Sequence, residues 1–313
     1  MLGRADVERL ISMPAVMAAL ERALKKPFRM PPKVYLDIPE RGGDFRAMPC
    51  YQEPYASLKW VSVYPGNPKR GLPTVMATIV LSDAATSFPL AIMDGTIITA
   101  YRTGAIGGLA AKWMAPKGSK VMGIVGAGVQ ARAQLLATDL ALGLDEARVF
   151  DLKDPLAKEF IKDMKGRVEC RIVPVASVEE AVRGADVIAT CTPSRKPILM
   201  DGWVKEGAHV NAIGADAPGK QELDPAILLR ASVYVDDPRQ AVHSGEVNVP
   251  IAAGLYSIDR IAGTVGDVVI GRAGRRSDDE VTVFDSTGLA VQDLAIAGVA
   301  LGAGRPGVGL EFP

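Results

Sequence analysis

Hydrophobic and polar positions follow two different patterns along this chain. Between residues 34 and 93, short alternating runs are separated by Pro and Gly, which predicts strands and turns of a mixed or antiparallel sheet. The expected strands are Val34–Ile38, Phe45–Met48, Leu58–Tyr64, Thr74–Leu81 and Phe88–Met93. From residue 121 onward, short apolar runs alternate with helical stretches, which is typical of a parallel sheet covered by helices.

Helical spacing of apolar residues marks three further segments. Residues 4–25 carry an apolar stripe that is interrupted near Pro14. A helix from about Ile97 to Met114 is rich in Gly and Ala. Each helical glycine costs roughly 1 kcal/mol relative to alanine, so we expect close backbone packing there. A last helix, from Leu289 to about Leu301, is long enough to return to the first domain, and the Gly/Pro-rich tail after it is expected to be loosely ordered or a short edge strand.

The second half of the chain predicts an α/β fold with a doubly wound, parallel Rossmann sheet. A domain boundary is expected at residues 115–118, so that residues 1–117 form one domain and 118–288 the Rossmann domain. Helices are expected at residues 178–183 and from Asp224-Pro225 onward. The expected strands are Val121–Val125, Ala147–Phe150, Arg171–Val175, Ala185–Cys191, Val210–Ile213, Val233–Val235 and Val281–Phe284. Polar loops follow these strands at the end where such sheets bind ligands.

The stretch from Lys120 to Asp151 carries a dinucleotide-binding fingerprint in its GxGxxA form. Gly126 permits a tight turn, Gly128 lets the backbone approach a pyrophosphate, and Ala131 keeps the helix close to the strand. The helix start offers backbone N–H groups to phosphates. The alternative is a glycine turn in an ordinary strand–helix unit that binds nothing.

Asp151 follows the second strand, where a carboxylate would bind the ribose hydroxyls. A carboxylate repels a 2′-phosphate, so Asp151 favours NAD over NADP as the cofactor. Lys153 and Lys158 lie nearby in the sequence and weaken that preference.

Composition narrows the class of protein. The 313 residues include 36 basic and 36 acidic side chains, so the formal charge is zero and neither nucleic acid nor a membrane is expected as a partner. No apolar run reaches the roughly 18–20 residues needed to span a bilayer, and we find no signal peptide. Cys50, Cys170 and Cys191 are far apart, and with only two histidines no metal site is expected. We therefore expect a cytoplasmic protein with reduced thiols.

Two residues are candidates for acid–base chemistry. Lys59 lies between apolar neighbours in an expected strand, and burial would lower its pKa enough for proton transfer. The pattern leaves open whether Lys59 is instead exposed on an edge strand. Asp216 follows an expected strand end, where a carboxylate would face the nicotinamide, although it is equally consistent with a hydrogen-bonded loop residue.

Two arginines are candidates for binding anions. Arg46 lies between apolar residues and could bind a substrate carboxylate with its planar fork. Arg102 lies in the glycine-rich helix and could reach a phosphate. Each is also consistent with a structural ion pair.

Several distinctive segments lie between about Met30 and Asp293: FRAMP, LKWV, AIMDGTIITAYRTGA, GIVGAGVQA, NAIGADAPGKQELDP, GEVNVP and VFDSTGLAVQD. Taken together, they resemble the ornithine cyclodeaminase/mu-crystallin family. The resemblance implies a homodimer, and it implies that the start and end of the chain, residues 1–117 completed by 289–313, form an α+β dimerisation and substrate domain.

Carried over to this sequence, the resemblance implies a role for several side chains. Lys59 and Asp216 match the catalytic lysine and aspartate of the family, and Arg102 matches an arginine that faces both cofactor and substrate. Together with the fingerprint, it gives as candidate NAD-binding residues Arg102, Gly126, Gly128, Val129, Gln130, Asp151, Lys153, Gly214, Ala215, Asp216, Lys220 and Ser286.

Arg46 is where the sequence departs from the ornithine-specific members, which carry a glutamate there. A glutamate suits the distal ammonium of ornithine, whereas an arginine repels it and suits a carboxylate, as in the alanine dehydrogenase members. We therefore expect a small amino-acid or keto-acid substrate, with Arg46 and Lys33 holding its carboxylate and Arg102 also facing it. The expected activity is reversible, NAD-dependent oxidative deamination of L-alanine. The alternatives are ornithine cyclodeamination, ketimine reduction, or binding of NAD(P)H and a small ligand without turnover.

Overall fold

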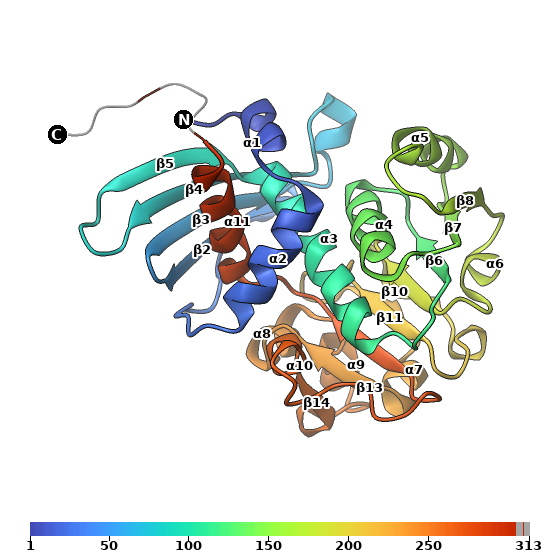
Figure 1. The fold of residues 1–313 in the computed structure, drawn as a ribbon. Helices are drawn as coiled ribbons and strands as arrows, with labels where there is room; N and C mark the ends of the chain where they lie inside the picture. The colour runs from blue at the N-terminus through green and yellow to red at the C-terminus, as the bar shows by residue number, and fades with distance from the viewer. Residues whose placement is uncertain (305–308, 310–313) are drawn as a thin grey trace. The chain divides into compact units, whose positions relative to one another are not determined.

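The computed structural model describes residues 1–304 and residue 309, and it divides into two compact units (Figure 1). Unit 1 comprises residues 1–102 together with the described residues from 289 onward, and unit 2 comprises residues 103–288. The division falls inside helix α3 (Gly95–Met114), whereas the sequence pattern suggested a boundary after residue 117. Most of the tail after residue 302 lies outside the described residues.

Unit 1 is built on an antiparallel sheet with the strand order β1-β2-β3-β4-β5. Helices α2 and α11 lie side by side across one face of this sheet, and α11 packs on β2, β3 and β4 (Figure 1). The strands are β1 (Val34–Ile38), β2 (Gly43–Gln52), β3 (Tyr55–Val63), β4 (Val75–Asp83) and β5 (Pro89–Asp94). The helices are α1 (Arg4–Leu10), α2 (Met13–Leu24) and α11 (Ala290–Gly302), with short 3-10 turns η1 (Pro39–Arg41) and η2 (Asn67–Arg70).

Strand alternation gives the sheet of unit 1 two different faces. Met48 and Val61 are buried against Leu294 of α11, so this face forms the core. Their neighbours in sequence point the other way, and Leu58 and Trp60 are each 41% exposed. One face of the sheet is therefore packed, and the opposite face is apolar but exposed.

Unit 2 is a parallel sheet with the strand order β14-β13-β15-β11-β9-β6-β7-β8. Its strands are β6 (Val121–Val125), β7 (Glu146–Phe150), β8 (Arg171–Pro174), β9 (Val187–Thr190), β11 (His209–Ala212), β13 (Ser232–Val235), β14 (Ile261–Thr264) and β15 (Thr282–Asp285). Its helices are α4 (Val129–Leu142), α5 (Asp154–Met164), α6 (Val178–Val182), α7 (Pro225–Arg230), α8 (Pro238–Ser244), α9 (Asn248–Ala252) and α10 (Val265–Val269). Shorter elements are β10 (Arg195–Leu199), η3 (Asp201–Trp203), β12 (Gln221–Leu223) and η4 (Ile258–Arg260).

Both faces of the parallel sheet are covered by helices. Met122 and Ile124 of β6 pack into a core with α4 and α5, whereas the adjacent Val125 joins a core with α6, α7 and α8. Because successive strand residues point to opposite faces, the sheet is doubly wound, and the predicted fold class is confirmed. The strands β10, β12 and β14 were not predicted.

The glycines of α3 pack where the sequence predicted close packing. A Cβ at Gly104 would lie 2.4 Å from the carbonyl oxygen of Ala133, and one at Gly108 would lie 2.7 Å from Cβ of Ala137. Both alanines belong to α4, so the two helices approach backbone to backbone. No helix among the described residues is long and apolar enough to cross a bilayer.

Candidate functional site

Lys59 lies on β3, the middle strand of the sheet in unit 1. It pairs with Met48 of β2 and Ile79 of β4, on the face that α11 covers. Its exposed fraction is 1%. The pattern of residues left an exposed edge strand open as an alternative, and the structure excludes it.

Asp293, in the first turn of α11, is the ion-pair partner of Lys59. The two charged atoms are 2.6 Å apart, and both side chains are 1% exposed. Nε of Arg102 lies 3.6 Å from the second carboxylate oxygen of Asp293. Arg102 also donates from Nη1 to Oε1 of Gln292 over 3.2 Å. The structure therefore gathers two cations and one anion on the buried face of the sheet.

Burial is the main influence on the protonation of Lys59. It lowers the pKa of the Lys59 amine from 10.5 to about 8, and the positive charges of Arg102 and Arg46 act in the same direction. The carboxylate of Asp293 opposes this shift. A lysine that loses its proton near pH 8 can act as a base or an acid under ordinary conditions.

Arg46 lies on the same sheet face and is 5% exposed. Asp44 holds its guanidinium by two hydrogen bonds, from Nε over 2.6 Å and from Nη2 over 3.1 Å. The ring of Tyr35, paired with Arg46 across β1 and β2, lies 5.2 Å below the guanidinium carbon. These contacts fix the direction of the fork. Lys33 lies one residue before β1 and is half-buried.

In unit 2, the glycine turn after β6 has the shape that a pyrophosphate requires. Gly126 has φ +95°, and a Cβ there would lie 2.8 Å from the carbonyl oxygen of Cys191. Gly128 precedes the first residue of α4, and a Cβ there would meet nothing within 4 Å. Val129 is 66% exposed, and Gln130 follows it in the first turn of the helix. This open helix start fits the phosphates of a dinucleotide.

Asp151 follows β7 and lies beside the glycine turn. Its carboxylate accepts hydrogen bonds from the backbone N–H of Ala127 over 2.8 Å and of Lys153 over 2.9 Å. The Lys153 side chain is exposed, and the neighbouring Leu152 is 91% exposed. The acid and the turn of the fingerprint are thus brought together, as dinucleotide binding requires.

Asp216 and Lys220 form an ion pair in the loop after β11, with 2.5 Å between Oδ1 and Nζ. The Asp216 side chain is 33% exposed and that of Lys220 17%. Gly214 and Ala215 lie in the same loop, and Ala215 is buried.

The glycine turn after β6, Asp151 after β7 and the loop of Asp216 after β11 all follow the carboxyl ends of parallel strands. β6 lies between β7 and β9. From β6 the chain continues to β7 and β8 on one side, and it then crosses to β9 and β11 on the other side, so the strand order reverses at β6. A ligand crevice is expected at such a point. Ser286 follows β15 and donates from Oγ to Asp236, which follows β13, over 3.2 Å.

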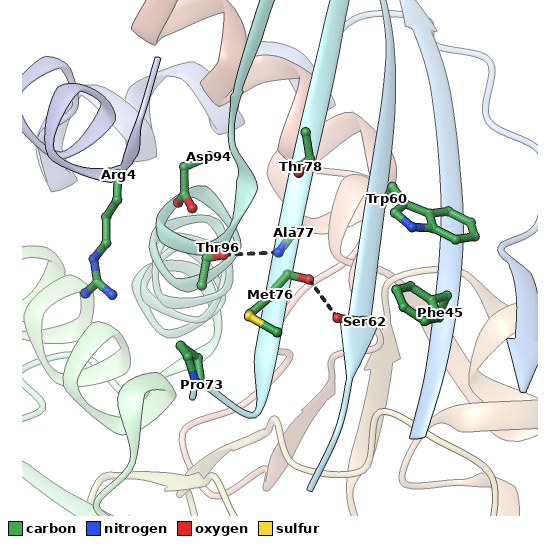
Figure 2. A pocket seen from close by; sticks show the side chains of 10 residues that line it. All are labelled: Arg4, Phe45, Trp60, Ser62, Pro73, Met76, Ala77, Thr78, Asp94 and Thr96. Atoms are coloured by element: carbon green, nitrogen blue, oxygen red, sulfur yellow. Dashed lines mark hydrogen bonds between the residues drawn. The ribbon is translucent and has the colours of Figure 1, made fainter. Parts of the chain in front are cut away.

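A hollow of about 400 Å³ lies in unit 1, and Figure 2 shows its lining. Lys59 is not among the lining residues, several of which lie on the exposed face of the sheet. The rings of Phe45 and Trp60 stack there, with centroids 5.2 Å apart. The hollow is lined by Arg4, Phe45, Trp60, Ser62, Pro73, Met76, Ala77, Thr78, Asp94 and Thr96. It therefore belongs to the exposed apolar face rather than to the Lys59 group.

Comparison with known proteins identifies the family of this chain. A model of the ornithine cyclodeaminase/mu-crystallin family matches residues 1–301. The protein belongs to this family. Among its relatives, an alanine dehydrogenase of Archaeoglobus fulgidus is 48% identical over 304 residues, 95% of this chain and 92% of that protein. An ornithine cyclodeaminase of Brucella melitensis is 37% identical over 256 residues, 81% of this chain and 69% of that protein.

Two solved structures of the ornithine cyclodeaminase/mu-crystallin fold are also similar. An archaeal alanine dehydrogenase dimer with bound NAD has a TM-score of 0.92 and 47% identity, and the match covers 96% of this chain and 94% of that one. The Δ1-pyrroline-2-carboxylate reductase of Thermococcus litoralis, in complex with NADH and L-proline, has a TM-score of 0.94 and 36% identity, with 96% of each chain covered.

The sequence patterns did not reveal several residues of this protein that contact the candidate site residues. Asp293 lies inside the segment VFDSTGLAVQD, which was recognised as a motif, but nothing local pairs it with Lys59. Gln292 beside it, and Asp44 and Tyr35 around Arg46, were also missed. An acid in the first turn of a returning helix was the available signal for Asp293.

Proposed function

We propose that this protein catalyses the reversible, NAD-dependent oxidative deamination of a small L-amino acid, with L-alanine as the substrate. The observation that carries the proposal is the buried Lys59 amine, which has a pKa of about 8 and is paired with Asp293. A proton-transfer group of this kind is what oxidation of an amino acid needs. The similarity to an alanine dehydrogenase, at 48% identity, supports the choice of substrate.

NAD is the proposed cofactor, and unit 2 carries the residues to hold it. The helix start after Gly128 would bind the pyrophosphate, and Asp151 the ribose hydroxyls. Gly126, Val129, Gln130, Lys153, Gly214, Ala215, Lys220 and Ser286 are the further proposed contacts. When bound, NAD supplies the acceptor for the hydride that leaves Cα of the amino acid.

The substrate carboxylate is assigned to the cations of unit 1. Arg46 is held in one direction by Asp44 and Tyr35, which is the pre-organisation that a two-bond carboxylate contact needs. Lys33 and Arg102 are the proposed supporting contacts. These cations also disfavour a substrate with a distal ammonium, since like charges repel.

Lys59 and Asp216 are the proposed proton-transfer residues. The neutral Lys59 amine takes a proton from the substrate ammonium, which leaves the amine ready to form an imine. Asp216 holds a water molecule and takes its proton as the oxygen bonds to the imine carbon. Lys59 then returns a proton to the nitrogen. As the C–N bond breaks, the hydroxyl proton passes to the leaving ammonia, which departs as ammonium with pyruvate as the other product, and Asp216 releases its proton to water.

The exposed apolar face in unit 1 is proposed to dock a second copy of the chain. Val34 is 62% exposed and Leu36 51%, on the same face as Leu58 and Trp60. Large exposed apolar faces mark protein interfaces. The archaeal alanine dehydrogenase at TM-score 0.92 is a dimer, which favours a homodimer here.

Light scattering tests the dimer. We expect twice the chain mass of 33.1 kDa for the wild type and the single chain mass for a Leu58→Lys, Trp60→Lys double variant. Leu255→Lys, at a leucine that is 56% exposed in unit 2, is the control and is expected to stay dimeric. A wild type that scatters as a single chain would exclude the dimer.

Two other activities of the family are the alternatives. An ornithine cyclodeaminase is 37% identical to this chain, and a cyclic-imine reductase has the TM-score of 0.94. In a cyclodeaminase, the side-chain amine of ornithine captures the imine, and NAD is regenerated without net consumption.

The three activities separate in one set of assays. Purified protein with NAD and L-alanine should accumulate NADH absorbance, with one ammonia released for each NADH. Ammonia from L-ornithine without NADH accumulation would mean a cyclodeaminase. NADH consumption with a cyclic imine alone would mean a reductase, and tight NADH binding without any turnover would mean a binding protein.

A further inference from the structure

The loop of residues 213–220, between β11 and β12, carries the proposed proton-transfer residue Asp216. Two backbone hydrogen bonds close turns within the loop, one from Asp216 N–H to the Gly214 carbonyl and one from Lys220 N–H to the Ala217 carbonyl. Such turns do not by themselves fix where a loop lies relative to its sheet. Two side chains to which no function has so far been given, Glu222 and Asn248, bind the loop in place. A third, Glu246, binds the strand that carries Glu222.

Glu222 ties the start of this loop to the loop after β9. One carboxylate oxygen accepts hydrogen bonds from the backbone N–H and the hydroxyl of Thr192, both over 2.7 Å. The other oxygen accepts from the N–H of Gly214 over 2.8 Å. The two loops are in direct contact, because a Cβ at Gly214 would lie 2.1 Å from the Thr192 carbonyl oxygen.

Asn248 ties down the other end of the loop. Its Oδ1 accepts from the N–H of Gly219 over 3.0 Å, and its Nδ2 donates to the carbonyl of Lys220 over 3.0 Å. An amide is the side-chain group that accepts and donates at once in this way. The loop is therefore held at both of its ends.

Glu246 supports the strand that carries Glu222. Its carboxylate accepts from the N–H of Glu222 over 2.9 Å and from the N–H of Leu223 over 2.7 Å. Glu246 and Asn248 both belong to GEVNVP, a segment recognised in the sequence to which the proposed reaction gives no role. That segment thus reaches the loop directly through Asn248 and indirectly through Glu222.

Packing alone does not account for these residues. Glu222 and Glu246 are both fully buried, and burial raises the pKa of each carboxyl above its usual range. A buried carboxylate is a poor source of stability compared with an apolar side chain of similar volume. What the two carboxylates provide is a defined direction for four backbone N–H groups, which an apolar residue cannot hold.

We propose that Glu222, Glu246 and Asn248 are positioning residues that hold the 213–220 loop in a single arrangement and so fix where Asp216 acts. The proposal rests on the proposed function of Asp216. None of the three residues is proposed to touch the substrate. Each acts through the backbone of the loop or of the strand that follows it.

Glu222→Gln tests the proposal with almost no change of shape. The amide that replaces one carboxylate oxygen puts a donor opposite the N–H of Thr192 or of Gly214. Amide hydrogen exchange in residues 213–220 should become about tenfold faster, because a loop hydrogen bond is lost. Turnover should fall by up to about 10²-fold, with the KM for the amino acid changing much less, because misplacement of Asp216 affects the chemical step.

Asn248→Asp is the second variant, and it removes the amide that donates to the carbonyls of Lys220 and Gly245 while keeping the acceptor for Gly219. We expect a smaller change in the same two measurements, and Asn248→Leu should give the full effect. Glu280→Gln is the matched control, because Glu280 is a nearly buried carboxylate that binds Ser232 and Arg276 instead of the loop. The control should leave exchange in 213–220 and turnover within about twofold of wild type.

The proposal is wrong if Glu222→Gln and Asn248→Leu lower the melting temperature yet leave loop exchange and the ratio of kcat to KM as in wild type. Exchange is measured without substrate, so it separates this proposal from the proposed function. A wild type without turnover on amino, keto or imino acids would reject the function. Unchanged loop exchange in the variants would reject the positioning role whichever reaction the protein catalyses.

Discussion

Both units of this protein bury charged side chains, but they surround them differently. In unit 1, Lys59 and Asp293 have opposite charge and lie 2.6 Å apart, so each side chain faces another that can gain or lose a proton. In unit 2, Glu222 and Glu246 bind backbone N–H groups, which do not exchange protons in a reaction. We propose that the first arrangement provides a reactive group and that the second fixes the course of the chain. Burial alone therefore does not mark a catalytic residue; what the buried charge faces decides its use.

The largest effect is expected from removing the reactive amine. Lys59→Met should lower turnover by about 10³-fold, because general acid–base transfer contributes roughly 10²–10⁴-fold. NADH binding should stay within about twofold of wild type, since the proposed cofactor contacts lie mainly in unit 2. Fluorescence titration of NADH alongside steady-state rates separates the two effects. Lys69→Met, at an exposed lysine of η2, is the control, and substantial activity in Lys59→Met would show that Lys59 is not the base.

A smaller effect, on KM rather than on kcat, is expected from a substitution of Arg46. Arg46→Lys keeps the positive charge but loses the two-bond fork, so the KM for L-alanine should rise by about tenfold while kcat changes little. Arg41→Lys in η1 is the exposed control. A rise in activity toward L-ornithine with no loss toward L-alanine would contradict the assignment of Arg46 to the substrate carboxylate.

In unit 2, a substitution of Asp151 tests the proposed contact with the cofactor ribose. Asp151→Ser should reduce the preference for NAD over NADP by about tenfold, because the carboxylate that repels a 2′-phosphate is removed. The KM for L-alanine at saturating cofactor should stay near that of wild type. An unchanged cofactor preference would mean that Asp151 serves only to bind the N–H groups of Ala127 and Lys153.

The smallest effect is expected in stability at Asp285, a buried acid of unit 2. Burial raises the pKa of Asp285 from 3.8 to about 7, so the folded protein holds this proton more tightly than the unfolded chain does. The stability that this proton contributes is present at low pH and is lost as pH rises from about 4 to 7. Asp285→Asn should remove this loss, so its Tm relative to wild type should rise by a few degrees between pH 4 and 7. A constant Tm difference across this range would show that Asp285 stays ionised.

The features predicted best from the sequence are those that depend on residues close together in the chain. Gly126, Gly128 and Asp151 belong to one strand–helix–strand unit, so their spacing alone indicated where the turn and the acid would meet. Phe45–Met48 and the other strands of unit 1 were also found from alternation, although β2 extends further at both ends. β12 was missed because it has three residues, too few to show any period.

The buried face of unit 1 could not be predicted from local pattern. Whether Lys59 is exposed depends on β2 and β4 pairing on either side of β3, which is decided by the whole order of the sheet. Its partner Asp293 lies far along the chain, in a helix that packs back onto that sheet. The family resemblance gave Lys59 its proposed role but left out Asp293, because a list of motifs holds no information on which of them touch.

The pH dependence of kcat/KM for L-alanine oxidation, in wild type and in Asp293→Asn, tests most directly whether the Lys59 amine is the base. If it is, the wild-type rate should rise with pH and level off above about pH 8, where Lys59 is neutral. In Asp293→Asn the same rise should occur at lower pH, because the carboxylate that raises the pKa of Lys59 is gone. A profile with no rise near pH 8, or one that Asp293→Asn leaves in place, would show that the Lys59 amine is not the base.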